Sequence, residues 1–132
     1  MNDVIRVDHK NGDRFDIGIR DHLIHVDQPI AAGGTDTAPT PTELFVASLA
    51  SCVAFYVRRF LARHGLPTDG LSVEVSFSMA DKPARVGEVH LSVDLPAGVP
   101  EERHAALLAV ASHCTVHNTL EQPPAVRIDL AA

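Results

Sequence analysis

The chain begins with short segments in which apolar and polar positions alternate. Phe15, Ile17 and Ile19 alternate with polar residues or glycine, which is the period-two pattern of a half-buried strand. Val4–Asp8 is a candidate strand before them, and an Asn-Gly pair between the two segments is a strong hairpin signal. HLIHVD at His22–Asp27 continues in the same way. The pattern predicts a three-stranded meander.

The most apolar segment predicts a long buried helix. Thr40 can cap its N-terminus, Pro41 suits the first helical position, and Glu43 completes a capping box with Thr40. Leu44–Ala62 then runs without Gly or Pro, and its middle, LFVASLASCVAFYV, is apolar almost all round. A helix without a polar face is buried on all sides. Since one small sheet cannot cover it, we expect a second subunit to do so.

Alternation returns after this helix. Leu71–Ser78 and Val86–Leu95 are joined by the polar loop ADKPAR, which favours an antiparallel pair. Three further elements are predicted: a helix opening at Pro100 with its apolar body at Ala105–Ala111, a short helix at Thr115–Glu121, and a last strand at Ala125–Leu130. Strands, helix, strands, helices and strand in this order are typical of an α+β fold.

Length and charge narrow the class of protein. The 132 residues fit one domain spanning 1–132. Net charge is −6, which argues against a nucleic-acid partner because phosphates are bound by clustered Lys and Arg. No apolar run approaches the roughly 18 residues that a membrane span needs, and MNDVIRVDHKNGD lacks the apolar stretch of a signal peptide. We therefore expect a cytoplasmic protein with no nucleic-acid or membrane partner.

The two cysteines are the main candidates for chemistry. They are too few for a disulfide scaffold, which leaves a redox, nucleophilic or metal role open. Cys52, in the middle of the apolar helix, is also explained as a small buried core residue. Cys114 stands at the start of the short third helix, where unsatisfied N–H groups favour a thiolate. The two thiols can form a reversible couple only if their Cα atoms lie within about 4.4–6.8 Å.

Histidines beside Cys114 suggest a metal site only weakly. His113 and His117 flank it, and Cys and His are zinc ligands that would share a helical face if the helix ran through both. A closed structural zinc site takes four ligands, however, and the sequence has no Cys-x-x-Cys pair. We expect neither a metal nor another bound cofactor.

Three charged residues, one at the start of the apolar helix and two beside the second strand, allow more than one interpretation. Glu43 can be a catalytic carboxylate, although the capping box explains it equally well. Arg20 and Arg14 flank the second strand and are either solvated or paired. A guanidinium near Cys52 would matter, because this thiol lies too far into its helix for the dipole to lower its pKa.

Two motifs give the sequence a family resemblance. GGTDTAPTPTELFVASLASC, ending at Cys52, is followed later in the chain by HCTVHNTL around Cys114. In this order and spacing they resemble the OsmC/Ohr family, the osmotically inducible and organic hydroperoxide resistance proteins. The resemblance implies an OsmC-like α+β fold in which antiparallel sheets wrap a central apolar helix in an intertwined homodimer.

The resemblance also implies an activity. Cys52 would be the peroxidatic thiolate and Cys114 the resolving thiol of a thiol-dependent peroxidase that reduces alkyl or lipid hydroperoxides in oxidative-stress defence. The reductant would be an external dithiol or a lipoylated protein. Arg20, or as second choice Arg14, would activate Cys52 together with Glu43. The apolar helix walls, with Phe55 and Tyr56, would bind the substrate.

Two positions depart from the family pattern. In the peroxidase branches the acidic residue stands where Thr42 is found here, and the carboxylate of this chain follows one residue later, at Glu43. Thr115 occupies a position where many relatives carry Pro. The sequence is more similar to an OsmC-like branch with the pattern ELxxAxLxxC. This leaves an alternative hypothesis: a dimeric protein that binds a small acyl or aromatic ligand, or a redox sensor, without peroxidase turnover.

Overall fold

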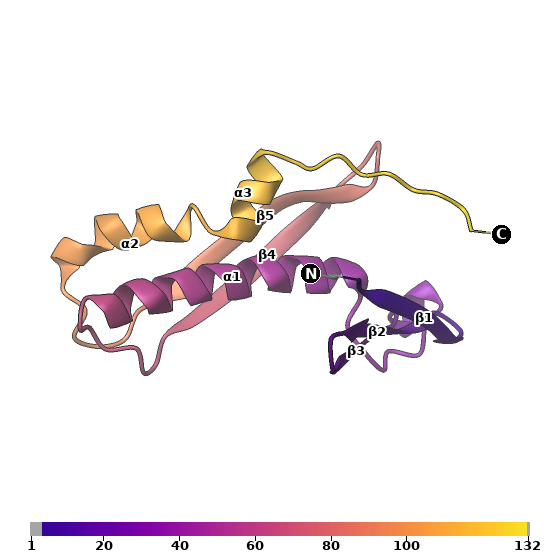
Figure 1. Cartoon of the computed structure of the whole chain (residues 1–132), viewed down its shortest axis with the longest axis horizontal. Helices are drawn as coiled ribbons and strands as arrows, with labels where there is room; N and C mark the ends of the chain where they lie inside the picture. The colour runs from indigo at the N-terminus through magenta and orange to yellow at the C-terminus, as the bar shows by residue number, and fades with distance from the viewer. Residues whose placement is uncertain (1–3, 132) are drawn as a thin grey trace. The chain divides into compact units, whose positions relative to one another are not determined.

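A computed structural model describes residues 4–131 of the chain (Figure 1). The chain divides into two compact units, one extending to Phe45 and the other beginning at Val46. Both are built from antiparallel strands and helices, which confirms the predicted α+β class.

The N-terminal unit contains the predicted meander. Its strands are β1 (Arg6–Asn11), β2 (Arg14–Ile19) and β3 (His22–Val26), and they form an antiparallel sheet in the order β1-β2-β3. The first hairpin turns at Gly12, whose positive φ of 53° is a conformation that glycine adopts without strain. The Asn-Gly signal therefore located the turn correctly, although the first strand begins two residues later than the alternation predicted.

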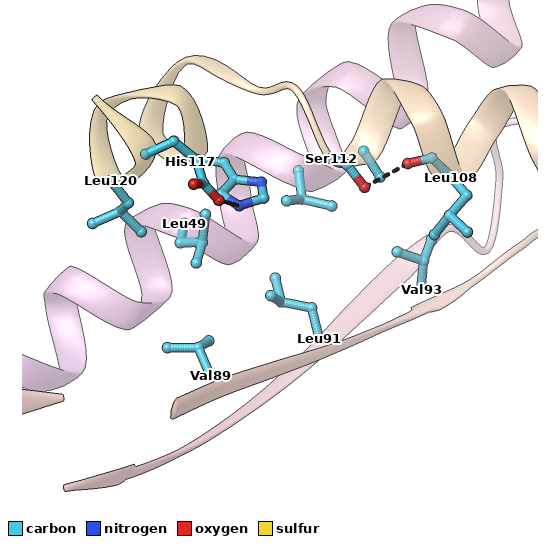
Figure 2. Close-up of a pocket in the computed structure, with 11 residues that line it drawn as sticks. Leu49, Val89, Leu91, Val93, Leu108, Ser112, His117 and Leu120 are labelled. Atoms are coloured by element: carbon cyan, nitrogen blue, oxygen red, sulfur yellow. Dashed lines mark hydrogen bonds and ion pairs between the residues drawn. The ribbon is translucent and has the colours of Figure 1, made fainter. Parts of the chain in front are cut away.

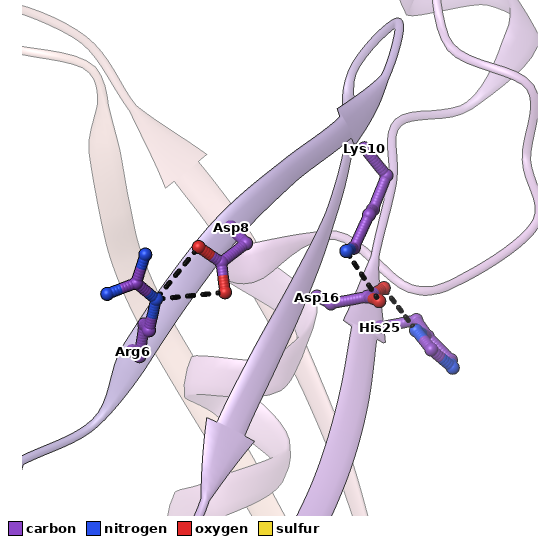
Figure 3. Close-up of polar contacts among 5 residues, drawn as sticks. All are labelled: Arg6, Asp8, Lys10, Asp16 and His25. Atoms are coloured by element: carbon purple, nitrogen blue, oxygen red, sulfur yellow. Dashed lines mark hydrogen bonds and ion pairs between the residues drawn. The ribbon is translucent and has the colours of Figure 1, made fainter.

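Register separates an apolar and a polar face on this sheet. Val7, Ile17 and Ile24 are paired across the three strands, and so are Asp8, Asp16 and His25 on the next row. On the polar row His25 Nδ1 lies 2.6 Å from Asp16 Oδ1, and Lys10 Nζ lies 3.9 Å from Asp16 Oδ2 (Figure 3). Because these pairs are partly exposed, they contribute at most modestly to stability.

Helix α1 (Pro41–Arg63) begins with the predicted capping box. Glu43 N–H donates to Thr40 Oγ1 at 3.0 Å, and Thr40 N–H donates to Glu43 Oε1 at 2.8 Å. The helix crosses from the N-terminal unit into the C-terminal one. One face is buried, through Val46, Leu49, Ala50, Val53, Val57 and Leu61. All-round burial, expected from the sequence, is not present in the single chain, because residues such as Ser51 and Phe55 on other faces remain exposed.

Helix α1 also corrects the expectation that no apolar segment is long enough to cross a membrane. By length and composition it is long enough, with a mean hydropathy of 1.6 over its most apolar window. One such helix is weak support for a membrane span, since the core helix of a soluble protein has the same properties. Here the buried face of α1 packs into the core of the C-terminal unit.

The C-terminal unit joins a hairpin to three helices. Strands β4 (Ser72–Ala80) and β5 (Arg85–Asp94) are antiparallel, with apolar pairs such as Val75 opposite Leu91. A short 3-10 turn, Glu101–Arg103, leads into α2 (His104–Ala111), and α3 (Thr115–Glu121) follows. The buried core consists of Leu49, Val53, Val57, Leu61, Leu107 and Cys114. Alternate residues of β5 pack against this core, as the period-two pattern predicted.

The predicted last strand is absent from the part of the chain that the structure describes. Residues 125–130 form no strand, and Val126, Ile128 and Leu130 are 80%, 85% and 98% exposed. Arg127 and Asp129, on the alternate positions, are 3.5 Å apart. The segment has the alternation of a strand but no neighbouring strand to pair with, and hydrogen bonding to a neighbour is what makes a strand.

Candidate functional site: a pair of free thiols

Cys52 belongs to the edge of the buried core. It lies on α1 between Leu49 and Val53, both of which are buried, and its own side chain is partly buried. Its side chain packs against the cluster that contains Cys114. The prediction that Cys52 packs in the core is therefore correct, although its side chain is only partly buried. Packing in the core does not exclude chemistry at the sulfur.

Cys114 begins the third helix, as the sequence predicted. It is the N-cap residue of α3, with extended backbone angles, and its Sγ accepts a hydrogen bond from His117 N–H at 3.4 Å. Its carbonyl accepts from Asn118 N–H at 2.8 Å, which closes the first turn of the helix. The side chain is completely buried, with an exposed fraction of 0%. The sulfur thus has both a structural role as a cap and a place in the core.

The two thiols interact with each other. Both cysteines are free, and Cys52 packs against the buried cluster that contains Cys114, close enough for the two sulfurs to affect each other's ionisation. The pKa of Cys114 is raised, first by burial and further by the neighbouring Cys52 thiol, while the His117 N–H acts in the opposite direction. The prediction that the helix start would favour a Cys114 thiolate is therefore wrong in its net effect. Burial penalises the charged form more than the backbone N–H groups of His117 and Val116 favour it. The raised pKa keeps Cys114 protonated at neutral pH.

Tyr56 and Phe55 lie one turn further along α1. Tyr56 is directed toward the start of α3, where its Oη lies 2.7 Å from Thr115 Oγ1. Phe55 is 49% exposed; the Tyr56 ring contacts it edge-on, and the Arg59 guanidinium lies 4.8 Å from its centroid. Tyr56 therefore has a polar contact beside the thiols that the sequence did not suggest.

An apolar cavity lies next to the thiol cluster. Its volume is about 440 Å³, and its wall comes from α1, β5, α2 and α3 (Figure 2). The lining residues are Leu49, Val53, Val89, Leu91, Val93, Leu108, Ala111, Ser112, His117, Leu120 and Glu121. Leu49 and Val53 line it and also belong to the core with Cys114. Phe55 and Tyr56, expected to contact substrate, do not line this cavity.

The polar groups of this cavity are few. His117 Nε2 lies 3.2 Å from Glu121 Oε1, and Ser112 Oγ donates to the Leu108 carbonyl (Figure 2). His113 is not on α3; its Nδ1 lies 2.7 Å from the Ala109 carbonyl oxygen of α2. The shared helical face that a His113–His117 metal site required is therefore not formed. Among residues 4–131, no group of three or more His, Cys, Asp or Glu side chains is arranged to hold a metal.

The remaining predicted site residues belong to the N-terminal unit. Glu43 is engaged in the capping box described above. Arg20 occupies the turn between β2 and β3 with a positive φ of 52°, and its side chain is exposed. Arg14 Nη1 donates to Thr37 Oγ1 at 2.8 Å. The structure brings Cys52 and Cys114 together, and it describes Arg20, Arg14 and Glu43 only within their own unit.

Sequence reasoning missed a buried carboxylate in the loop before α1. Asp27 is 1% exposed and accepts hydrogen bonds from the N–H groups of Gln28, Thr35 and Thr37 and from both Thr hydroxyls. The Thr35 hydroxyl first, followed by the Thr37 and Gln28 N–H groups, holds the pKa of Asp27 well below its ordinary value. The available signal was an Asp followed by two Thr residues in a Gly-rich loop. Asp27 fixes the loop that leads into α1.

These features define a class: an α+β protein of antiparallel hairpins in which a long apolar helix and a short helix bring two free thiols together. The model of the OsmC-like protein family matches residues 34–129 of this chain. The chain therefore belongs to the OsmC-like family, as the two cysteine motifs predicted. No curated protein sequence matches it significantly.

Solved structures share the fold over nearly the whole chain. A protein from Psychrobacter arcticus, named for osmotic stress induction and a detoxification response, has a TM-score of 0.83 at 25% identity, covering 90% of this chain and 88% of its own. An OsmC-like protein from Mycoplasma pneumoniae has a TM-score of 0.79 at 16% identity, with 93% and 89% covered. The organic hydroperoxide resistance protein OhrB of Bacillus subtilis has a TM-score of 0.61 at 20% identity, with 91% and 92% covered.

Proposed function

We propose that this protein is a thiol-dependent peroxidase that reduces organic hydroperoxides, with Cys52 as the peroxidatic residue and Cys114 as the resolving residue. The observation that carries the proposal is the packing of the free Cys52 thiol against the buried cluster that contains the free Cys114 thiol. Structural relatives that are named organic hydroperoxide resistance proteins support the same class of substrate. No cofactor is required for this chemistry, because both electrons come from the two sulfurs.

The reaction balances in three steps. The Cys52 thiolate attacks the terminal oxygen of ROOH, the O–O bond breaks, and the alkoxide leaves as ROH after taking up a proton, so that Cys52 becomes a sulfenic acid. The Cys114 sulfur then attacks the Cys52 sulfur, which forms the disulfide and releases water. An external dithiol, free or as the lipoyl group of a protein, reduces the disulfide by two exchange steps and is itself oxidised to a disulfide.

The protonation of Cys114 suits the second role. A thiol that keeps its proton is a poor nucleophile toward hydroperoxide, since the thiolate is the reactive form. Its place in the cluster against which Cys52 packs keeps it near the sulfenic acid when that forms. The division of labour follows from burial: the completely buried sulfur resolves, and the less buried one meets the substrate.

The apolar cavity supports an alkyl substrate. Its volume of about 440 Å³ lies in the range of small-molecule sites, and its wall is mainly Leu, Val and Ala. We assign it the hydrocarbon part of the hydroperoxide. Phe55 and Tyr56 remain candidates for the substrate entrance, and an Arg that activates Cys52 remains part of the proposal, with Arg20 first, Arg14 second, and Glu43 as its carboxylate partner.

The assembly and location belong to the proposal as well. A homodimer would cover the faces of α1 that one chain leaves exposed, including Phe55. A cytoplasmic location would keep both thiols reduced between turnovers. Sedimentation of the purified protein at micromolar concentration tests the dimer.

The decisive experiment measures cumene hydroperoxide consumption by reduced protein with dihydrolipoamide as the reductant. Wild type should turn over, and Cys52→Ser should be inactive. Cys114→Ser is the matched control: with dihydrolipoamide left out, it should consume one equivalent and accumulate a sulfenic acid that dimedone traps at Cys52. If Cys52→Ser keeps wild-type turnover, or if wild type is inert toward several alkyl hydroperoxides, the peroxidase proposal is wrong.

The cavity also favours a second candidate function, the binding of an acyl or aromatic ligand without turnover. Cys52 is not among the residues that line it, so a ligand can occupy the cavity without meeting that sulfur. Binding of a fluorescent fatty acid that is equal in wild type and Cys52→Ser, together with an inert wild type, would select this function.

A further inference from the structure

We propose that Tyr56 and Thr115 form a clamp that positions the two thiols for disulfide formation. The inference rests on the pairing of Cys52 with Cys114 in the proposed function, but not on the hydroperoxide step. The observation is the hydrogen bond between Tyr56 Oη and Thr115 Oγ1, at 2.7 Å. It connects the two segments that carry the sulfurs.

Each end of the bond is adjacent to one cysteine. Tyr56 follows Cys52 by one helical turn on α1, so the two side chains emerge from the same face of the helix. Thr115 directly follows Cys114 and is the first residue of α3. The chain therefore has two neighbouring contacts between α1 and the start of α3: the packing of Cys52 against the cluster with Cys114, and the hydrogen bond from hydroxyl to hydroxyl.

The start of α3 depends on Cys114 itself. The first turn closes through His117 N–H to Cys114 Sγ and Asn118 N–H to the Cys114 carbonyl. When Cys114 enters a disulfide, its sulfur must turn toward Cys52 while the helix start stays in place. A second attachment to α1 then prevents the first turn of α3 from moving away from α1. The Tyr56–Thr115 bond supplies this attachment, and Tyr56 also packs against the buried core.

The clamp acts through preorganisation. Without the hydrogen bond between the hydroxyls, the start of α3 has more conformational entropy in the reduced protein. Disulfide formation must then remove this entropy, which makes the disulfide less favourable. A neutral hydrogen bond of this kind contributes about 0.5–1.5 kcal/mol net. Removing it should therefore lower the equilibrium constant for disulfide formation about threefold to tenfold, and the reduction potential should rise by about 15–30 mV for a two-electron couple. Tyr56 and Thr115 are positioning residues, because they act through the cysteines.

The test is equilibration of the purified protein in dithiothreitol redox buffers, with the disulfide quantified by mass spectrometry after alkylation. Tyr56→Phe and Thr115→Val should each show the threefold to tenfold loss, and the double variant should show no more than either alone. Thr115→Ser keeps the hydroxyl and should retain the wild-type constant. Thr119→Val is the matched control, since the Thr119 hydroxyl donates to the Thr115 carbonyl within the same helix.

The outcomes separate this inference from the peroxidase proposal. An unchanged constant in both Tyr56→Phe and Thr115→Val, an equal loss in Thr119→Val, or failure of Thr115→Ser to behave like wild type overturns the clamp. A protein that shows the expected pattern in redox buffer but consumes no hydroperoxide retains the clamp and loses the peroxidase. Should Tyr56→Phe not fold, the comparison of Thr115→Val with Thr115→Ser decides alone.

Discussion

The acidity of Cys114 gives the sharpest quantitative prediction, because burial and backbone N–H groups act on its pKa in opposite directions. The side chain is completely buried, which disfavours the thiolate, and His117 N–H donates to the sulfur at 3.4 Å, which favours it. Burial of an ionisable group can shift its pKa by up to about 3–5 units. One hydrogen bond to a charged group contributes about 1.5–3 kcal/mol, or about one to two units. Burial therefore wins, and the pKa of Cys114 lies above that of an ordinary thiol.

The variant Cys52→Ser isolates the effects of burial and of N–H donation on the pKa of Cys114. It leaves Cys114 as the single cysteine and removes the neighbouring thiol that also raises the Cys114 pKa. We expect the ultraviolet absorbance of the thiolate to appear with a midpoint above the pKa of about 8.5 of an unperturbed cysteine. Wild type should titrate this sulfur at a higher pH still. Unfolding the variant in denaturant should return the midpoint to the ordinary value.

The result has a kinetic counterpart. If the thiolate of Cys114 attacks the sulfenic acid, the rate of disulfide formation should rise about tenfold per pH unit through neutrality, because the reactive fraction rises in that proportion below the pKa. A midpoint at or below the ordinary value in folded Cys52→Ser would refute the reasoning, since it would mean that the helix cap outweighs burial. A flat rate between pH 6 and 8 would contradict the kinetic part alone.

Other predictions concern stability. Leu61→Ala should lower the free energy of unfolding by about 2–5 kcal/mol in urea titrations, because Leu61 is 0% exposed in the core; a loss below 1 kcal/mol would mean that the site collapses freely. Thr40→Ala should cost about 1 kcal/mol by the same assay through loss of the α1 cap, and Thr40→Ser should restore most of it. The lowered pKa of Asp27 means that its carboxylate stabilises the fold above pH about 4, and that this contribution is lost as the pH falls further. Asp27→Asn should therefore be less stable than wild type at pH 7, and the difference should shrink in acid; a pH-independent difference would show that charge plays no part.

Caps and turns were predictable from the sequence, because the residues that form them lie next to one another in the chain. The capping box of Thr40 and Glu43 needs only four consecutive residues, and it forms as the sequence indicated. The Asn-Gly turn and the N-terminal position of Cys114 on α3 are of the same kind. In each case the backbone groups to be satisfied lie within a few residues of the side chain that satisfies them.

The errors occurred where burial or pairing depends on distant parts of the chain. Alternation at residues 125–130 indicates which side chains a strand would bury, but a strand also needs a neighbour, and residues 4–131 provide none for this segment. The net pKa direction of Cys114 depends on how deeply α1 and α2 cover it, which the motif HCTVHNTL does not encode. The Tyr56–Thr115 bond and the Asp27 network likewise join residues whose proximity only the folded chain creates.

The location of Cys114 among Leu61, Val57 and Leu107 has a consequence for how this protein can change over evolutionary time. In many redox proteins the reactive residues occupy a surface cleft, and the interior can drift independently of them. Here a substitution that repacks the interior also changes the distance and orientation of one sulfur. Selection on disulfide chemistry and selection on folding therefore act on the same few positions. Homologues with a different core composition should differ in reduction potential even where both cysteines and all surrounding polar groups are identical.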